Sequence, residues 1–155
     1  MFTVSVVVGV DAELDEDSVA DVNQTEDRIV SQWAEREVSA EDRHELRDRF
    51  DEILRPLGYE TSLVVIRRAN SLALYFICMT LSALMSLRDQ WRSWQLNDIV
   101  QKIFTFLSHT TQTFRVGRLY ITVPQPVRVN RLTWPLADYQ RCLNFFSPVQ
   151  SKQAI

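Results

Sequence analysis

The sequence predicts an α+β domain in which helices cover one face of a four-stranded antiparallel sheet. Segments rich in β-branched residues alternate along the chain with longer segments whose apolar residues recur at helical spacing. The turn Ala69-Asn70-Ser71 joins two strand segments and is too short for a parallel crossover. With 155 residues, 46% of them apolar, the chain is long enough to bury one core without disulfides or metal ions. We therefore expect a single domain over residues 1–155.

The first strand is expected at Phe2–Val10, where apolar residues alternate and β-branched residues are frequent. Its apolar character favours a central position in the sheet. The residues expected to share one side of this strand are Phe2, Val4, Val6 and Val8. An acidic loop follows over about residues 11–28, because Asp11 to Asp27 contain eight acids and no base. We expect this segment to be a solvated loop or weak helix, with an acidic contact loop as the alternative.

The first helical region is predicted over about Ala40 to Arg55, after a short helix around Ile29 to Trp33. Ser39 opens the sequence Ser-Ala-Glu-Asp, which is close to a capping box. Pro56 and Gly58 end the helix. The residues expected on its buried face are Leu46, Phe50, Ile53 and Leu54.

Two strands and a second helical region come next. Tyr59–Arg68 and Leu72–Cys78 are rich in apolar and β-branched residues, and the short turn between them predicts an antiparallel hairpin. The hydroxyl of Thr80 suits a helix N-cap. Two apolar stripes follow, Leu81, Leu84, Leu87 and Trp91, then Leu96, Ile99, Ile103 and Leu107. They predict two helices, or one bent helix, over the sheet. A membrane span fits less well, because Arg88 interrupts the apolar run too early.

The fourth strand is expected at Phe114–Val123, and Pro124 ends it. The residues expected on one side near its end are Leu119, Ile121 and Val123. An extended piece around Val127 to Leu132 and a C-terminal helix over about residues 135–146 complete the chain. The resulting order of strand, helix, strand, strand, helix, strand is that of a ferredoxin-like βαββαβ sandwich.

Residue types that carry enzyme chemistry are few and scattered. The three glycines lie too far apart for a phosphate-binding loop or a dinucleotide fingerprint. His44 and His109 have no motif around them and are expected at the surface. Cys78 and Cys142 lie in apolar segments without metal-ligand spacing and are expected to be reduced core residues. We therefore expect no catalytic residue, no metal site, no cofactor and no enzymatic activity.

Charge divides the chain into two halves of opposite sign. Residues 1–60 hold 17 acids and 6 arginines, a formal charge of −11, whereas residues 61–155 hold 3 acids and 11 bases, a formal charge of +8. Such asymmetry favours surfaces that meet different partners, or homotypic assembly in which the acidic half of one copy meets the basic half of another. The alternative is that the two fields partly cancel inside one domain. No secretory signal is visible, so we expect a cytoplasmic protein.

RNA binding is the alternative function, because βαββαβ domains of the RNA-recognition type stack bases on strand aromatics. Candidate aromatics and cations lie together in the predicted strands: Tyr75, Phe76, Phe114 and Tyr120, with Arg67, Arg68, Arg115 and Arg118. The third strand reads LALYFIC, however, and lacks the basic, glycine and aromatic pattern of these modules. Overall acidity also opposes binding to a polyanion.

The segment LALYFICMTLSALMSLRDQWRSWQLNDIVQKIF resembles the N-terminal domain family of the TNF-receptor-associated death domain adaptor (TRADD). The matching positions are Cys78, Thr80, Leu81, Ala83, Leu84, Leu87, Trp91, Ser93, Leu96 and Asn97. The tail segment LTWPLADYQRCLNFF resembles that module's closing element through Leu132, Tyr139 and Cys142. Trp94 and Gln95 depart from the pattern, because a glycine is common at this turn.

The resemblance implies a non-enzymatic α/β sandwich whose exposed sheet face docks a TRAF-type adaptor, or a similar module, in innate immune or apoptotic signalling. Our own alternation analysis supplies the residues. If Val4, Val6 and Val8 face the helices, then alternate residues of the first strand point outward. The candidate partner-binding residues are Thr3, Ser5, Val7, Tyr75, Ile77, Arg118 and Tyr120. Burial of Tyr75 and Ile77 under the C-terminal helix is the alternative.

Overall fold

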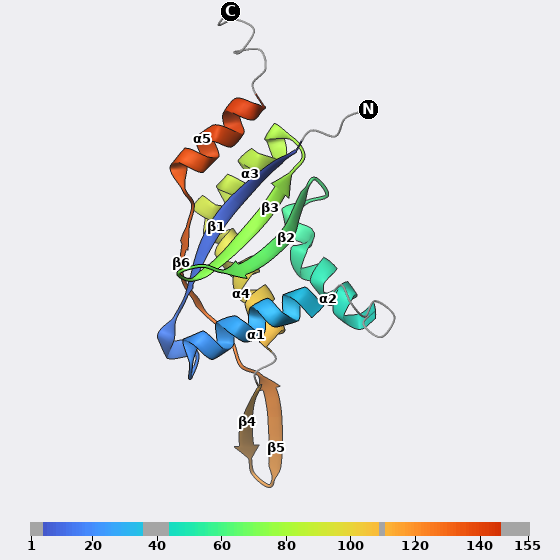
Figure 1. The fold of residues 1–155 in the computed structure, drawn as a ribbon. Helices are drawn as coiled ribbons and strands as arrows, with labels where there is room; N and C mark the ends of the chain where they lie inside the picture. The colour runs from blue at the N-terminus through green and yellow to red at the C-terminus, as the bar shows by residue number, and fades with distance from the viewer. Residues whose placement is uncertain (1–4, 36–43, 109–110, 147–155) are drawn as a thin grey trace, which may run out of the picture.

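A computed structural model describes residues 5–35, 44–108 and 111–146 (Figure 1). The strands are β1 (Val6–Leu14), β2 (Thr61–Arg68), β3 (Leu72–Cys78), β4 (Thr111–Val116), β5 (Leu119–Pro124) and β6 (Val129–Thr133). The α-helices are α1 (Val22–Glu35), α2 (His44–Leu54), α3 (Leu81–Arg92), α4 (Gln95–Ser108) and α5 (Leu136–Phe145), and short 3₁₀ turns are η1 (Glu16–Ser18) and η2 (Arg55–Leu57). The predicted α+β class is confirmed.

The larger sheet has four strands in the order β2-β3-β1-β6, and every neighbouring pair is antiparallel. The predicted central position of β1 is therefore confirmed. Its register with β3 runs from Val6 opposite Cys78 to Ala12 opposite Leu72. The hairpin of β2 and β3 forms as the turn chemistry predicts.

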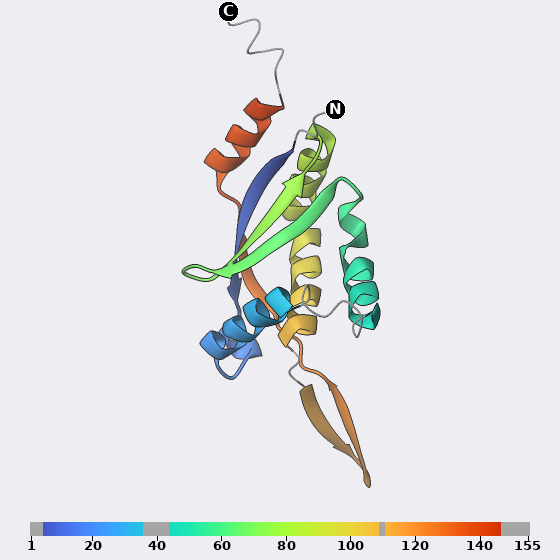
Figure 2. The same ribbon diagram turned by 45° about the vertical axis from the view of Figure 1, so that its right-hand side comes forward.

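The core lies between one face of this sheet and the helices. Alternate residues of β1 from Val6 to Leu14 are buried, and α4 buries an almost continuous apolar face between Leu96 and Leu107. Figure 2 shows α3 and α4 behind the strands, while α1 crosses one end of the sheet. On the outer side of α4, Phe50 of α2 packs edge-on against Trp33 of α1 and Phe106 of α4. The opposite sheet face carries no layer of helices among the described residues.

The predicted acidic segment is wrong in its first third, which belongs to a strand, whereas its last third begins α1, as the helix alternative predicted. Ala12 and Leu14 continue the buried alternation of β1, so the strand extends to Leu14 and its acids point outward. Helix α1 then begins at Val22, because Thr25, Ile29 and Trp33 give it a buried stripe, within which the Glu26 side chain is also buried. The N-terminal part of the expected first strand, with Phe2 and Val4, lies outside the described residues.

The second helical region is two helices, as one of the two predictions had it. The Thr80 hydroxyl accepts a hydrogen bond from the Ala83 backbone at 3.1 Å, so the predicted N-cap is confirmed. Helix α3 ends at Arg92, and Trp94 then adopts a φ of 69° before α4 begins. A positive φ favours glycine, so Trp94 is an unfavourable residue for the turn between the two helices.

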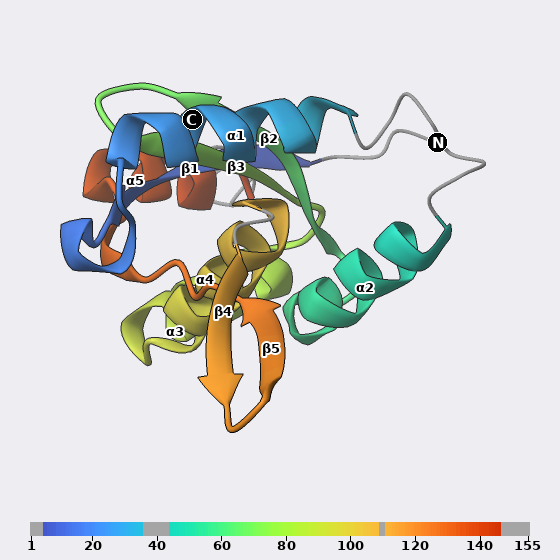
Figure 3. The same cartoon turned by 90° about the horizontal axis from the view of Figure 1, so that it is seen from below.

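The prediction of one strand over Phe114–Val123 in the main sheet is wrong. Gly117, with a φ of 62°, turns the chain so that β4 and β5 form a separate two-stranded sheet. This hairpin projects beyond the end of the main sheet (Figures 1 and 2), and it lies in front of α3 and α4 when the structure is seen from below (Figure 3). Its neighbour β6, within the predicted extended piece, occupies the fourth place beside β1. The apolar residues stand at even positions before Gly117 and at odd positions after it, and the prediction of one strand overlooked this change of phase.

Helix α5 covers an edge of the main sheet. Strand β6 pairs with Asp11–Leu14, and no described strand lies beside the first half of β1 on that side. The Gly9 backbone N–H donates to Asp138 at 3.3 Å, and Arg141 donates to the Val7 carbonyl at 2.9 Å. The thiol of Cys142 approaches the same carbonyl at 3.7 Å. Side chains of α5 thus satisfy backbone groups that an unpaired strand would present to solvent.

Within the described ranges, no helix combines the length and apolar character needed to cross a membrane.

Candidate functional site

The open face of the main sheet gathers three of the predicted partner-binding residues. Val7 is 45% exposed, and Tyr75 and Ile77 are half-buried beside it. The register explains this grouping, because Val7 lies opposite Ile77 and Gly9 lies opposite Tyr75 on the same side of the pleat. The alternative, complete burial of Tyr75 and Ile77 under the C-terminal helix, does not occur: α5 flanks the face and leaves both side chains partly accessible.

The ring of Tyr75 is held in place on this face by two neighbouring residues, Arg67 and Gly9. The Arg67 guanidinium lies 4.8 Å from the centre of the Tyr75 ring and donates a hydrogen bond to its hydroxyl at 2.7 Å. The ring lies across Gly9, where a Cβ atom would approach Tyr75 Cε1 to 3.2 Å. Glycine at this position therefore lets an aromatic ring lie close to the sheet surface. An aromatic side chain held on two sides loses little entropy when a partner covers it.

A hollow of about 440 Å³ extends from Tyr75 to α5. Its lining residues are Val7, Gly9, Asp11, Ala73, Tyr75, Pro135, Asp138 and Arg141. Asp138 and Arg141 form an ion pair at 2.8 Å on its rim, and the hydrogen bond from Arg141 to Asp138 raises the pKa of Arg141 further above its ordinary value. The hollow thus has an apolar floor and a charged rim, which is the composition of a protein-binding patch.

The remaining predicted residues lie elsewhere. Ser5 is exposed just before β1, and Thr3 lies outside the described residues. Arg118 and Tyr120 belong to the β4–β5 hairpin, so they do not share a sheet with Tyr75. Their expected place beside Tyr75 is wrong, because alternation identifies the face of a strand but not the sheet that the strand joins.

Three polar residues that frame the face, Arg67, Asp138 and Arg141, were not among the predicted partner-binding residues, although Arg67 was a candidate cation for RNA binding. Arg67 reaches Tyr75 across the β2–β3 hairpin, so its pairing could have been found from the predicted register. Asp138 lies 129 residues from Gly9 in the chain, and no local pattern links the two.

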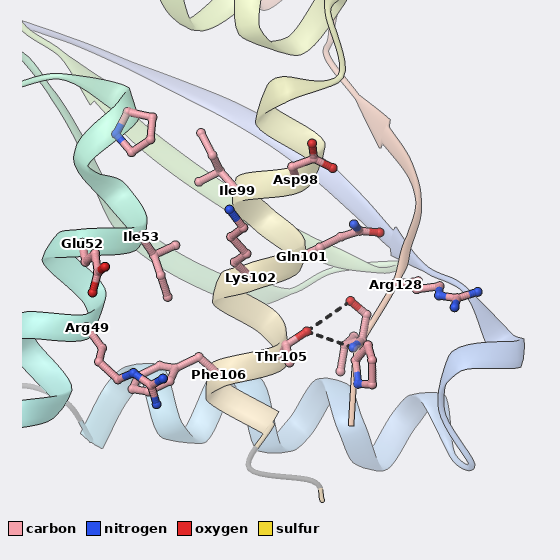
Figure 4. Close-up of a pocket in the computed structure, with 13 residues that line it drawn as sticks. Arg49, Glu52, Ile53, Asp98, Ile99, Gln101, Lys102, Thr105, Phe106 and Arg128 are labelled. Atoms are coloured by element: carbon pink, nitrogen blue, oxygen red, sulfur yellow. Dashed lines mark hydrogen bonds between the residues drawn. The ribbon is translucent and has the colours of Figure 1, made fainter. Parts of the chain in front are cut away.

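A second concave surface, a groove of about 730 Å³, lies between α2 and α4 (Figure 4). Ile53, Ile99 and Phe106 contribute apolar side chains, and charged groups of both signs line it. Thr105 accepts a hydrogen bond from the Val127 backbone N–H at 2.9 Å and donates to the Val127 carbonyl at 3.5 Å, which fixes the segment that leads into β6. None of the residues that line this groove was predicted to belong to a binding site, since its walls come from segments that lie far apart in the sequence.

The two cysteine thiols, Cys78 and Cys142, are both buried. Burial raises the pKa of Cys78 to about 11, and burial also raises the pKa of Cys142. The side chain of His44 and the whole of His109 lie outside what the structure describes. Among the described residues, no group of three or more His, Cys, Asp or Glu side chains is arranged to hold a metal ion.

A comparison of this chain with protein-family models, curated proteins and solved structures finds no match.

Proposed function

We propose that this domain is a non-enzymatic adaptor module that binds another protein through the open face of its four-stranded sheet. The observation that carries the proposal is the Tyr75 platform, which is an aromatic ring held by Arg67, seated on Gly9 and flanked by the exposed Val7. Tyrosine and arginine are enriched among residues that dominate binding energy at protein interfaces. A partner that covers the ring and the hollow beside it would bury an apolar centre within a polar rim.

We also propose that the domain has a ferredoxin-like topology. We take β6-β1-β3-β2 as the sheet of a ferredoxin-like βαββαβ core, with the β4–β5 hairpin inserted before the last strand. The antiparallel order and the placement of α1, α3 and α4 on one face support this description.

The resemblance to the TRADD N-terminal domain family suggests which partner binds this face. We propose a TRAF-type adaptor, or a similar module, that takes part in innate immune or apoptotic signalling in the cytoplasm. Local features support it. The cap at Thr80 forms, and the Trp94 backbone has the conformation that a glycine adopts readily. Tyr139 and Cys142, from the resembling tail, are buried.

Base stacking on Tyr75 fits the same face less well. The Arg67 guanidinium already occupies the ring, and Asp11 and Asp138 line the adjoining hollow. A stacked base would have to displace the Arg67 guanidinium, and the phosphates of the RNA would approach the carboxylates of Asp11 and Asp138. Binding of a protein requires neither of these changes.

The test is capture of partners from a lysate of the source cells, followed by direct binding of each purified candidate to the purified domain. Tyr75→Asp should abolish both capture and direct binding. Tyr59→Asp is the matched control, because Tyr59 is fully exposed in the turn before β2 and should leave binding unchanged. Thermal unfolding of both variants checks that the fold persists. Recovery of RNA-dependent material alone, lost after nuclease treatment, contradicts the adaptor function and supports RNA binding.

A further inference from the structure

The β4–β5 hairpin exposes an apolar face that nothing in the described chain covers. Its side chains are Phe114, Val116, Leu119, Ile121 and Val123, which are between 36% and 71% exposed. The register places Phe114 opposite Ile121 and Val116 opposite Leu119, so all five share one side of the ribbon. The other side is polar, because Thr113 and Thr122 pair there through their hydroxyls at 3.2 Å. The hairpin is therefore amphipathic without resting on the body of the domain (Figures 1 and 2).

A hairpin that packs against nothing else has little stability of its own. A two-stranded ribbon is at best marginally stable in water, and each strand here leaves an unpaired backbone edge. Each apolar side chain that a partner covers stabilises the assembly, in proportion to the area removed from water. An apolar patch of this kind on one side of a projecting element is typical of an association surface.

A second copy of this chain fits the surface. Two such hairpins can pack with their apolar faces together, as two sheets do at about 10 Å separation. A two-fold arrangement buries no charged side chain of β4 or β5, because Arg115 lies on the opposite side of each ribbon, paired with Tyr120. A strand of six residues spans about 20 Å. The overlapping length is therefore enough for all five apolar residues of each copy to meet those of the other.

Charge also favours a second copy. Residues 111–124 contain Arg115 and Arg118 and no acid, whereas η1 and α1 carry an excess of acids. Exposed acids in and beside η1 are Glu13, Glu16, Asp17 and Asp21, and they outnumber the exposed Arg128 and Arg131 that lie next to them. The hairpin leaves the domain at the end where η1 and α1 lie (Figure 1). In an antiparallel overlap, the tip of one hairpin reaches the base of the other, so each Arg118 comes near the acidic end of its partner.

We propose that the β4–β5 hairpin is a dimerisation arm, through which two copies of this chain pack the Phe114–Ile121 faces of their hairpins together in antiparallel orientation. The proposal is separate from partner binding at Tyr75, because the two surfaces lie on different sheets.

Analytical ultracentrifugation of the purified chain over a wide concentration range tests it. The wild type should pass from monomer to dimer. Leu119→Thr combined with Ile121→Thr should weaken the dimer on the order of a hundredfold or more, since two buried side chains per copy are lost. Tyr120→Thr is the matched control on the polar side of β5 and should leave the dimer constant unchanged. Circular dichroism should show an intact domain in every variant.

A second measurement examines the orientation. Ile121 lies near the middle of the ribbon, so two copies related by a two-fold axis bring these residues together. Ile121→Cys should give a cross-linked dimer with a short bismaleimide, which joins two cysteines across facing sheets, and Tyr120→Cys should not. The native Cys78 and Cys142 are buried and do not compete. A wild type that remains monomeric at every concentration overturns the proposal, even if the hairpin then binds vesicles or RNA. A dimer that survives the double substitution overturns it equally.

Discussion

Arg67 and Tyr75 form a single unit on the open sheet face, in which the guanidinium lies 4.8 Å from the ring centre and donates a hydrogen bond to the ring's hydroxyl at 2.7 Å. Exposed cation–π contacts of this kind contribute about 0.5–1 kcal/mol. The pair is therefore a minor contributor to stability, and its main effect is to hold Tyr75 in one orientation.

Replacing Arg67 should separate these two effects. Arg67→Ala is expected to lower the free energy of unfolding by no more than about 1 kcal/mol. It should weaken direct binding of a captured partner by roughly tenfold, because Tyr75 is no longer preorganised. Urea unfolding and calorimetric titration measure the two quantities. Arg55→Ala, an exposed arginine in η2, is the control. Full affinity in Arg67→Ala would mean that Tyr75 needs no positioning.

Trp94 offers a stabilising substitution. Its φ of 69° is costly for a residue with a Cβ atom, and the ring is 64% exposed, so little burial is lost on replacement. Trp94→Gly should raise the free energy of unfolding by about 0.5–1 kcal/mol, after the entropy that glycine adds to the unfolded chain is subtracted. Urea unfolding measures the change. Ser93→Gly, at a φ of −86°, should give no gain. Equal responses at the two positions would exclude backbone strain as the cause.

Glu26 makes stability depend on pH. Burial raises the pKa of its carboxyl above the ordinary 4.5, although Arg68 at 3.5 Å lowers it in part. The folded state therefore holds the proton more tightly than the unfolded chain, and this contribution to stability is lost as pH rises through the folded pKa.

Glu26→Gln should remove that contribution. Relative to wild type, the variant is expected to gain melting temperature as pH rises from the ordinary glutamate pKa toward neutrality. Arg68 keeps Asp27 and Asn23 as partners, at 2.6 Å and 2.9 Å, so the substitution does not leave it isolated. Differential scanning calorimetry of both proteins across this range supplies the comparison. A constant difference in melting temperature at every pH would contradict the role of Glu26.

Cys78 should resist thiol reagents while the domain is folded. With a pKa of about 11, only about one thiol in a thousand is ionised at pH 8, and burial blocks access as well. In a Cys142→Ala background, labelling by a maleimide is expected to follow the fraction unfolded in urea. Mass spectrometry of the labelled chain gives the rate. Rapid labelling in native buffer would show that the β3 end opens readily.

The spacing of apolar and capping residues in the sequence correctly predicted the structural features that depend only on residues close together in the chain. The bounds of Leu72–Cys78, the cap at Thr80 and the shared face of Val7 and Ile77 all follow from spacing that a short segment contains. Sheet membership does not, because alternation reads the same in a projecting hairpin and in the main sheet. Two local signals mark β4 and β5 as separate strands: the turn at Gly117, and the change in the phase of apolar alternation across that turn.

The candidate face was predictable only in part, for the same reason. Tyr75 could be placed outward from its neighbours in sequence, but its contact with Gly9 depends on the pairing of β1 with β3. Asp138 and Arg141 reach β1 from the opposite end of the chain, and only the folded structure brings them there.

The cover that α5 gives to β1 has a consequence for synthesis. Helix α5 follows every strand that the structure describes, so these strands can assemble while the Val7 carbonyl and the Gly9 N–H still lack their partners. Until residues 136–145 have left the ribosome, the nascent sheet carries an open edge on which another extended chain can add. A rare-codon pause just after β6 would prolong that interval, whereas rapid translation through α5 closes it.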